Sequence, residues 1–194
     1  MKALRKVTGI VAVLDRADVD TDQIIPKQFL KRIERTGFGE FLFFDWAKDP
    51  DFELNRPEFE GAKILITGRN FGCGSSREHA AWALQDAGFD VVIAPSFGDI
   101  FRQNALKIGL LPVAVEEAAE LMGYAGQQLT VDLEAQEVRA PGHFVVPFAL
   151  GEFERQCILE GLDEIGLTLR REDAIDAYEA ERSAPVDTTA LAAG

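Results

Sequence analysis

The sequence predicts an α/β fold, and three observations support this prediction. First, three short apolar runs follow one another at residues 61–67, 91–94 and 110–115. Second, helical patterns separate these runs. Third, a strand–helix–strand–helix–strand order is typical of a parallel sheet covered by helices. A length of 194 residues and an apolar fraction of 47% suit one compact domain.

Upstream of this layer, residues 7–14 are apolar and β-branched, which predicts a strand that runs into an acidic turn at residues 15–22. Residues 27–60 predict a flap or loop region. Their first part is rich in phenylalanine, glycine and basic residues, and residues 49–60 are polar and contain two prolines, which predicts an exposed loop or insertion.

The two helical patterns inside the layer lie at residues 80–84 and 100–108, the second ending at Gly109. A serine followed three residues later by an acidic residue is the spacing of a capping box, in which two side chains satisfy the first NH groups of a helix. This spacing occurs at Ser75 with Glu78 and at Ser96 with Asp99. Both pairs are therefore expected to start helices.

Beyond the layer, alternating polarity predicts a β-hairpin at residues 128–139, and helical patterns occupy residues 150–160 and 171–182. Residues 183–194 are small, polar and rich in alanine, so a disordered tail is expected there. The expected organisation is one domain over residues 1–182 followed by this tail.

The charge and cysteine content restrict the possible functions. Twenty Lys and Arg against 33 Asp and Glu give a net charge of −13, which argues against nucleic acid or an acidic membrane as the main partner. The two cysteines, Cys73 and Cys157, are too few for a disulfide framework or for an iron–sulfur cluster. We find no apolar run of membrane-spanning length and expect a cytoplasmic protein.

The most informative segment is residues 69–80, which reads Arg-Asn-Phe-Gly-Cys-Gly-Ser-Ser-Arg-Glu-His-Ala. It follows a predicted strand and precedes a predicted helix. Gly72 and Gly74 allow close approach of the backbone to a ligand, and the start of a helix favours a bound anion. Arg77 can bind a carboxylate through two parallel hydrogen bonds. The segment therefore predicts an anion-binding active site.

Other glycine-rich signatures do not fit this segment, which lacks the Gly-Lys-Ser/Thr of a phosphate-binding loop, the third glycine of a dinucleotide fingerprint and the Gly-x-Ser-x-Gly of a serine hydrolase. Cys73 is interpreted as a small residue in a tight turn rather than as a nucleophile. His79 is either a structural histidine or a group that orients Ser75.

Two further charged groups have open interpretations. The acidic run from Asp18 to Asp22 is either a divalent-cation site or a solvated turn with one functional carboxylate, and the second interpretation is favoured. Arg32 and Arg35 either form a second carboxylate clamp or are exposed loop charges.

Three blocks carry a family resemblance: Asp-Thr-Asp-Gln-Ile-Ile-Pro at residues 20–26, Gly-Ser-Ser-Arg-Glu-His at residues 74–79, and Ile-Ala-Pro-Ser-Phe at residues 93–97. With the matches at residues 132–138 and 161–169, the chain resembles the small subunits of 3-isopropylmalate dehydratase, within the aconitase superfamily. The resemblance implies a single swivelling β/β/α domain like the aconitase C-terminal domain.

The resemblance also implies roles for individual residues. Ser75 matches the catalytic base of the superfamily, and Asp22 matches an active-site aspartate. Ser76 and Arg77 match residues that bind a substrate carboxylate, for which Arg35 or Arg32 is the candidate second clamp. Where related hydratases have a serine, this chain has Ile25, so Ile25 and Leu30, with Ile24 and Phe29, are expected to contact an isopropyl group.

The implied reaction is the interconversion of 2-isopropylmalate and 3-isopropylmalate through isopropylmaleate, in leucine biosynthesis. It implies a [4Fe-4S] cluster that is carried by a large partner subunit and acts on the leaving hydroxyl as a Lewis acid. The chain is expected to be active only with that subunit. Two alternatives remain open: a hydro-lyase acting on citraconate or methylmalate, and a non-catalytic module that binds anions.

Overall fold

The structure is a computed structural model that describes residues 1–31 and 36–181. Its contacts divide the chain into two units, Met1–Leu162 and Asp163–Gly194. The described part of the second unit consists of α6 (Glu164–Leu169) and α7 (Glu172–Glu181). A single domain over residues 1–182 stays a prediction, and the expected tail lies outside the described residues.

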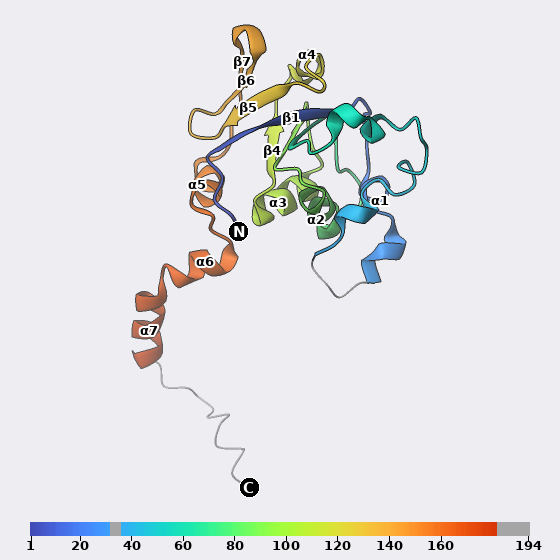
Figure 1. Ribbon diagram of the computed structural model, residues 1–194. Helices are drawn as coiled ribbons and strands as arrows, with labels where there is room; N and C mark the ends of the chain where they lie inside the picture. Colours follow the sequence, from blue (N-terminus) through green and yellow to red (C-terminus); the bar gives the residue numbers. More distant parts are fainter. Residues whose placement is uncertain (32–35, 182–194) are drawn as a thin grey trace. The chain divides into compact units, whose positions relative to one another are not determined.

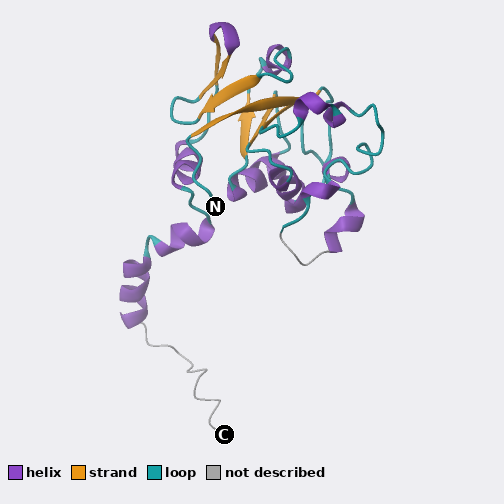
Figure 2. Ribbon diagram, viewed as in Figure 1, coloured by secondary structure: helices purple, strands orange, loops and turns teal. Residues whose placement is uncertain are grey.

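The first unit is built on one mixed sheet in the order β4-β3-β2-β1-β5-β6-β7 (Figures 1 and 2). Its strands are β1 (Lys6–Leu14), β2 (Ile64–Thr67), β3 (Val91–Ala94), β4 (Leu111–Ala114), β5 (Gln128–Asp132), β6 (Glu137–Ala140) and β7 (Phe144–Pro147). The first four strands are parallel to one another, whereas β5 joins β1 in antiparallel pairing and continues into an antiparallel meander. The predicted α/β fold with a parallel layer is therefore confirmed.

Short helices connect the strands. The α-helices of this unit are α1 (Thr21–Ile24), α2 (Glu78–Asp86), α3 (Asp99–Ile108), α4 (Ala118–Met122) and α5 (Glu152–Glu160). Short 3₁₀ helices occupy Lys27–Lys31, Gly39–Phe41, Glu53–Asn55, Pro57–Phe59 and Pro141–His143. Both α2 and α3 lie on the same side of the parallel strands (Figure 1).

The parallel strands are buried on both faces, because their side chains alternate between two apolar clusters. Leu65 and Val92 belong to the cluster that includes the alanines of α2 and Phe101 of α3. Their neighbours Ile66 and Ile93 belong to the cluster on the other face, which also holds residues of α4 and of the meander. Burial on both faces explains why these strands read as continuous apolar runs in the sequence.

The predicted strands, the hairpin and the longer helices are confirmed, but α1, α4, α6 and β7 were not expected. The first of them lies in the segment predicted to be only an acidic turn. It is four residues long and starts at a capping box: Asp20 Oδ1 accepts a hydrogen bond from Gln23 N, and Gln23 Oε1 accepts one from Asp20 N, each 2.8 Å long. Such a helix is specified by its cap rather than by apolar periodicity.

Both capping boxes predicted for the parallel layer are wrong. Helix α2 begins only at Glu78, with Arg77 as its N-cap, and α3 begins after Gly98; neither cap makes a side-chain hydrogen bond to its helix. The Ser75 carbonyl accepts from Arg77 N, which closes a turn before α2 starts. The Ser96 hydroxyl accepts instead from Asn70 N, at 2.9 Å.

The described residues of the expected flap region, 27–31 and 36–60, include several core aromatics. Phe38, Phe43, Phe52 and Phe59 are at most 6% exposed and pack in the same cluster as α2. Residues 49–60 are mostly exposed, as predicted, but Phe52 and Phe59 anchor this segment in the core.

Candidate active site

Three loops meet at one edge of the parallel layer, where β1, β2 and β3 end. The carboxyl edge of parallel strands is the usual place of a binding site in α/β proteins. The loop after β1 contributes α1, the loop after β2 contributes the glycine-rich segment, and the loop after β3 contributes residues 95–98. The strand order therefore brings together segments that are far apart in the sequence.

Backbone hydrogen bonds join the loop after β1 to the glycine-rich segment. Asp18 N donates to Arg69 O at 2.9 Å, Gly72 N to Val19 O at 2.8 Å, and Thr21 N to Cys73 O at 3.0 Å. These bonds run side by side like a short parallel ladder. The two loops consequently form one joined unit at the edge of the sheet.

The loop after β3 supports the glycine-rich segment from its other side. Phe71 N donates to Ser96 O at 3.1 Å, and Gly98 N donates to Phe71 O at 2.9 Å. Gly72 follows with a φ of +73°, and a Cβ on it would lie 2.2 Å from Cγ of Phe101. Only glycine fits this position, because both the backbone conformation and the space exclude a side chain.

The turn that precedes α2 presents its side chains at the surface. Ser75 and Ser76 are exposed, and Gly74 before them has a φ of +94°. The serines lie next to the N-terminus of a nine-residue helix, where the helix dipole stabilises a negative charge. The expected anion site is therefore open to a ligand on this side.

Arg77 and Asp22 form an ion pair across the two joined loops. The side chain of Arg77 is 16% exposed, and that of Asp22 is 53% exposed. Nη1 of Arg77, the atom that contacts the Asp22 carboxylate, is buried. Interaction with Arg77 keeps the pKa of Asp22 below its usual value despite the opposing effect of burial.

Cys73 and His79 have surroundings that fit structural roles. Burial, and then the charges of Asp20 and Asp18, raise the pKa of the Cys73 thiol, which disfavours the reactive thiolate. The ring of His79 packs against Phe38 and Trp82, with centroid distances of 5.2 and 4.7 Å, and burial lowers its pKa.

Of the four apolar residues expected to contact an isopropyl group, only two are accessible at the surface. Ile24 and Ile25 are fully buried in the core, whereas Phe29 and Leu30 are half-buried. Arg32 and Arg35 lie outside the described residues. The substrate-binding roles of Ile25, Leu30 and the two arginines stay predictions.

The sequence analysis missed two residues that shape the site, Asn70 and Thr21. Asn70 has a φ of +57° and donates from Nδ2 to Asp18 Oδ1 at 2.8 Å, and Asp18 itself has a φ of +56°. An asparagine before a phenylalanine and two glycines was the available signal, because asparagine tolerates positive φ better than most residues. Thr21 donates through its hydroxyl to Ser75 O at 3.2 Å.

The residues of this chain do not fit a [4Fe-4S] cluster. Such a cluster requires three or four thiolate ligands, and the whole sequence has two cysteines. Cys157, on α5, is buried, and Cys73 lies in the glycine-rich segment. In residues 1–31 and 36–181, three or more His, Cys, Asp or Glu side chains nowhere come together as a metal site.

Within the same described ranges, we find no helix with the length and apolar character needed to cross a membrane.

Comparison with protein families gives three matches along the chain. The aconitase C-terminal domain matches residues 1–118, a model described as LeuD_N matches residues 119–152, and the C-terminal domain of the 3-isopropylmalate dehydratase small subunit matches residues 164–184. The boundary between the first two falls at α4, after the parallel layer is complete.

Among similar proteins, the 3-isopropylmalate dehydratase small subunit of Acidobacterium capsulatum is 55% identical, with 93% of this chain and 91% of that protein covered. The small subunit of Bacillus licheniformis is 54% identical over 94% of this chain and 98% of that protein. A crystal structure of 3-isopropylmalate dehydratase from Methanocaldococcus jannaschii superposes with a TM-score of 0.68 at 27% identity, covering 90% of this chain and 99% of that chain.

Proposed function

The chain belongs to the family of 3-isopropylmalate dehydratase small subunits, and we propose that it supplies one half of the active site that interconverts 2-isopropylmalate and 3-isopropylmalate in leucine biosynthesis. The enzyme is a hydro-lyase of two kinds of subunit, of which this chain is the smaller. Isopropylmaleate is the dehydrated intermediate. The observation that supports this assignment is the clustering of Ser75, Arg77 and Asp22 at the carboxyl edge of the parallel strands.

Ser75 is the proposed base, whose Oγ takes the proton from the substrate carbon next to the hydroxyl-bearing carbon. In the hydration half of the reaction, the same atom delivers a proton to the carbon that had carried the hydroxyl, and hydroxide adds to the carbon that had lost its proton. The cluster proposed for the partner subunit would act as the Lewis acid for the hydroxyl that leaves and returns. A serine hydroxyl does not ionise at neutral pH without help. The N-terminus of α2 and the guanidinium of Arg77 supply nearby positive potential, and closure by the partner would remove water and strengthen both effects.

Ser76 and Arg77 are the proposed ligands of one substrate carboxylate. The largely buried side chain of Arg77 is held in place by an ion pair with Asp22, and the two serines directly precede Arg77 in the same turn. A carboxylate that arrives from the exposed side would receive charge-assisted hydrogen bonds from this pre-oriented cation. The second carboxylate clamp, Arg35 or Arg32, remains part of the proposal.

The partner subunit is proposed to carry the [4Fe-4S] cluster, since the donors of this chain do not fit one. The predicted cytoplasmic location belongs to the same proposal. The proposal also includes the prediction that neither nucleic acid nor a membrane is a partner, which the net charge of −13 supports.

Reconstitution tests the proposal. This chain and a cluster-bearing large subunit should each be inactive alone and should interconvert the two isopropylmalates when mixed. In the Ser75→Ala complex we expect turnover to fall about 10²–10⁴-fold, the usual contribution of a general base. Thr130→Ala, which removes a hydroxyl on β5, serves as the control and should retain activity.

Three results would contradict the proposal. A loss of less than tenfold in the Ser75→Ala complex would exclude Ser75 as the base. Faster turnover of citraconate or methylmalate than of the isopropyl substrates would assign the chain to a different hydro-lyase. Tight dicarboxylate binding by this chain alone, with no activity beside any large subunit, would favour the non-catalytic alternative.

A further inference from the structure

Thr21 is a buried polar residue at the first position of α1. Only 1% of its surface is exposed, and it is one of four polar residues buried in the described part of the chain, with Thr67, Asn104 and Asp132. A buried hydroxyl is unfavourable unless it forms a hydrogen bond, so its partner shows what the residue does. Threonine is also a poor helix former, and helix propensity therefore does not explain it.

Both donors of Thr21 bind the turn that carries Ser75. Its amide N donates to Cys73 O at 3.0 Å, and its hydroxyl donates to Ser75 O at 3.2 Å. These two carbonyls lie on either side of Gly74. Thr21 therefore holds the turn on both sides of a residue whose own backbone is unusually free.

The Ser75 carbonyl is held from a second direction by Arg77 N, at 2.8 Å. With two donors on one oxygen, the peptide plane that links Ser75 to Ser76 is fixed. The side chains of Ser75 and Ser76 are exposed and cannot anchor this peptide by packing. An ideal Cβ on Gly74 would lie 3.7 Å from the Thr21 hydroxyl, which shows how closely Thr21 abuts the turn.

We infer that Thr21 is a positioning residue for Ser75: its hydroxyl fixes the peptide after the base, and thereby the direction from which Oγ meets the substrate. The inference rests on the proposed role of Ser75. Because Asp22 follows Thr21 and pairs with Arg77, α1 holds the base through Thr21 and the carboxylate clamp through Asp22. A shift of about 1 Å in a reacting group can lower a rate about 10²-fold.

Thr21→Val tests the inference, because it removes the hydroxyl and retains the branched shape. In the reconstituted enzyme we expect kcat to fall about tenfold or more while KM changes less than about threefold, since the clamp remains and only the base is displaced. Thr21→Ser keeps the hydroxyl and should restore kcat to within about threefold of the wild type.

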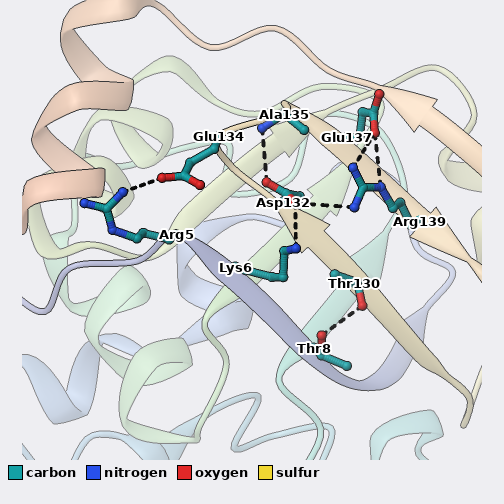
Figure 3. A network of polar contacts seen from close by, with 9 residues as sticks. All are labelled: Arg5, Lys6, Thr8, Thr130, Asp132, Glu134, Ala135, Glu137 and Arg139. Atoms are coloured by element: carbon teal, nitrogen blue, oxygen red, sulfur yellow. Dashed lines mark hydrogen bonds and ion pairs between the residues drawn. The ribbon is translucent and has the colours of Figure 1, made fainter.

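Thr130→Val is the matched control. Thr130 also makes a hydroxyl hydrogen bond, 2.8 Å long, to Thr8 across β1 and β5 (Figure 3). Thr8 lies near the start of β1, whereas the candidate site lies beyond its carboxyl end. This variant should keep the wild-type kcat and KM. A fall in kcat shared by Thr130→Val and Thr21→Val would overturn the inference, because it would show that any lost threonine hydroxyl lowers activity.

A Thr21→Val enzyme with wild-type kcat, or one changed in KM alone, overturns the inference. If Thr21→Val does not fold, Thr21→Ser and Thr21→Ala decide the question, since they differ by one oxygen atom; equal kcat values contradict a role for the hydroxyl. An inactive wild-type complex would instead contradict the proposed function. Failure of the two proposals is therefore distinguishable.

Discussion

Asp22 and Arg77 form an ion pair that joins α1 to the turn before α2, although the two residues are 55 positions apart in the sequence. Asp22 is half exposed and Arg77 is largely buried, so the pair holds the guanidinium in place while leaving its surroundings open to solvent on one side. The cation proposed to bind substrate is therefore oriented before the substrate arrives, which reduces the entropy lost on binding.

Arg77→Lys should raise KM for isopropylmalate about tenfold or more, because an ammonium keeps the charge but cannot form two parallel hydrogen bonds to a carboxylate. Initial rates of the reconstituted enzyme over a range of substrate concentrations measure the effect. Arg69→Lys is the control in the same segment. Its side chain is 73% exposed and lies 3.8 Å from Asp18, so KM should not change. Equal KM values for wild type and Arg77→Lys would contradict carboxylate binding by Arg77.

Gly72→Ala should destabilise the protein by about 2 kcal/mol more than Gly61→Ala. Both glycines have similar φ values, +73° and +69°, so the strain of placing an alanine at positive φ is similar in the two variants. Only at Gly72 would the new Cβ meet another group, Phe101 at 2.2 Å, whereas Gly61 has open space. Urea denaturation of the two variants gives the difference. Equal losses would show that Phe101 can move aside.

The sequence predicted the strands correctly where the burial of their side chains follows a regular pattern. The strands β2 and β3 are buried on both faces and therefore read as uninterrupted apolar runs, and the alternation at residues 128–139 follows from one buried face. It was uninformative for α1, whose four residues are fixed by the side chains of Asp20 and Gln23, and for β7, where only Val146 is buried.

At the site, the grouping of Ser75, Ser76 and Arg77 could be predicted because these residues are adjacent in one turn. The pairing of Arg77 with Asp22 could not, since it depends on the parallel order of β1 and β2. The sequence also does not show whether an apolar residue faces the core or the surface. Ile25 was expected at the surface and is fully buried, because the chain after α1 turns into the core.

Arg16→Lys should lower the free energy of unfolding by about 1–2 kcal/mol. The guanidinium of Arg16 lies 4.3 Å from the ring centroid of Trp46 and donates two hydrogen bonds to Glu53, 3.1 and 2.9 Å long. Burial alone would raise the pKa of Glu53, but hydrogen bonding to Arg16 brings it below its usual value. Lysine can form neither the two parallel hydrogen bonds to Glu53 nor the planar stacking on Trp46.

Urea denaturation measures this loss, and Arg56→Lys is the matched control. Arg56 contacts Glu58 only at 3.9 Å, with both side chains more than half exposed, so its replacement should change stability by less than about 0.5 kcal/mol. A similar loss in both variants would show that the two hydrogen bonds and the ring stacking of Arg16 add no stability beyond that of an exposed arginine.

Asp132→Asn should destabilise the protein by about 1–3 kcal/mol near pH 7, and the difference from the wild type should shrink in acid. Asp132 is 7% exposed at the end of β5 and accepts hydrogen bonds from Lys6 at 2.9 Å, Ala135 N at 3.0 Å and Arg139 at 3.4 Å (Figure 3). The hydrogen bond from Lys6, then that from Ala135 N, keep the pKa of Asp132 below its usual value in the folded state.

The direction of the pH dependence follows from this lowered pKa. The unfolded chain binds a proton to Asp132 at about pH 3.9, before the folded protein does, so the stabilisation is complete above that pH and is lost as the pH falls through the folded pKa. Urea denaturation near pH 7 and near pH 3 measures the wild-type-minus-variant difference. Asp45→Asn is the control: Asp45 pairs with Lys48 but is 64% exposed, so its replacement should change stability little at either pH. A difference for Asp132→Asn that is the same at both pH values would show that its carboxylate charge does not stabilise the hairpin.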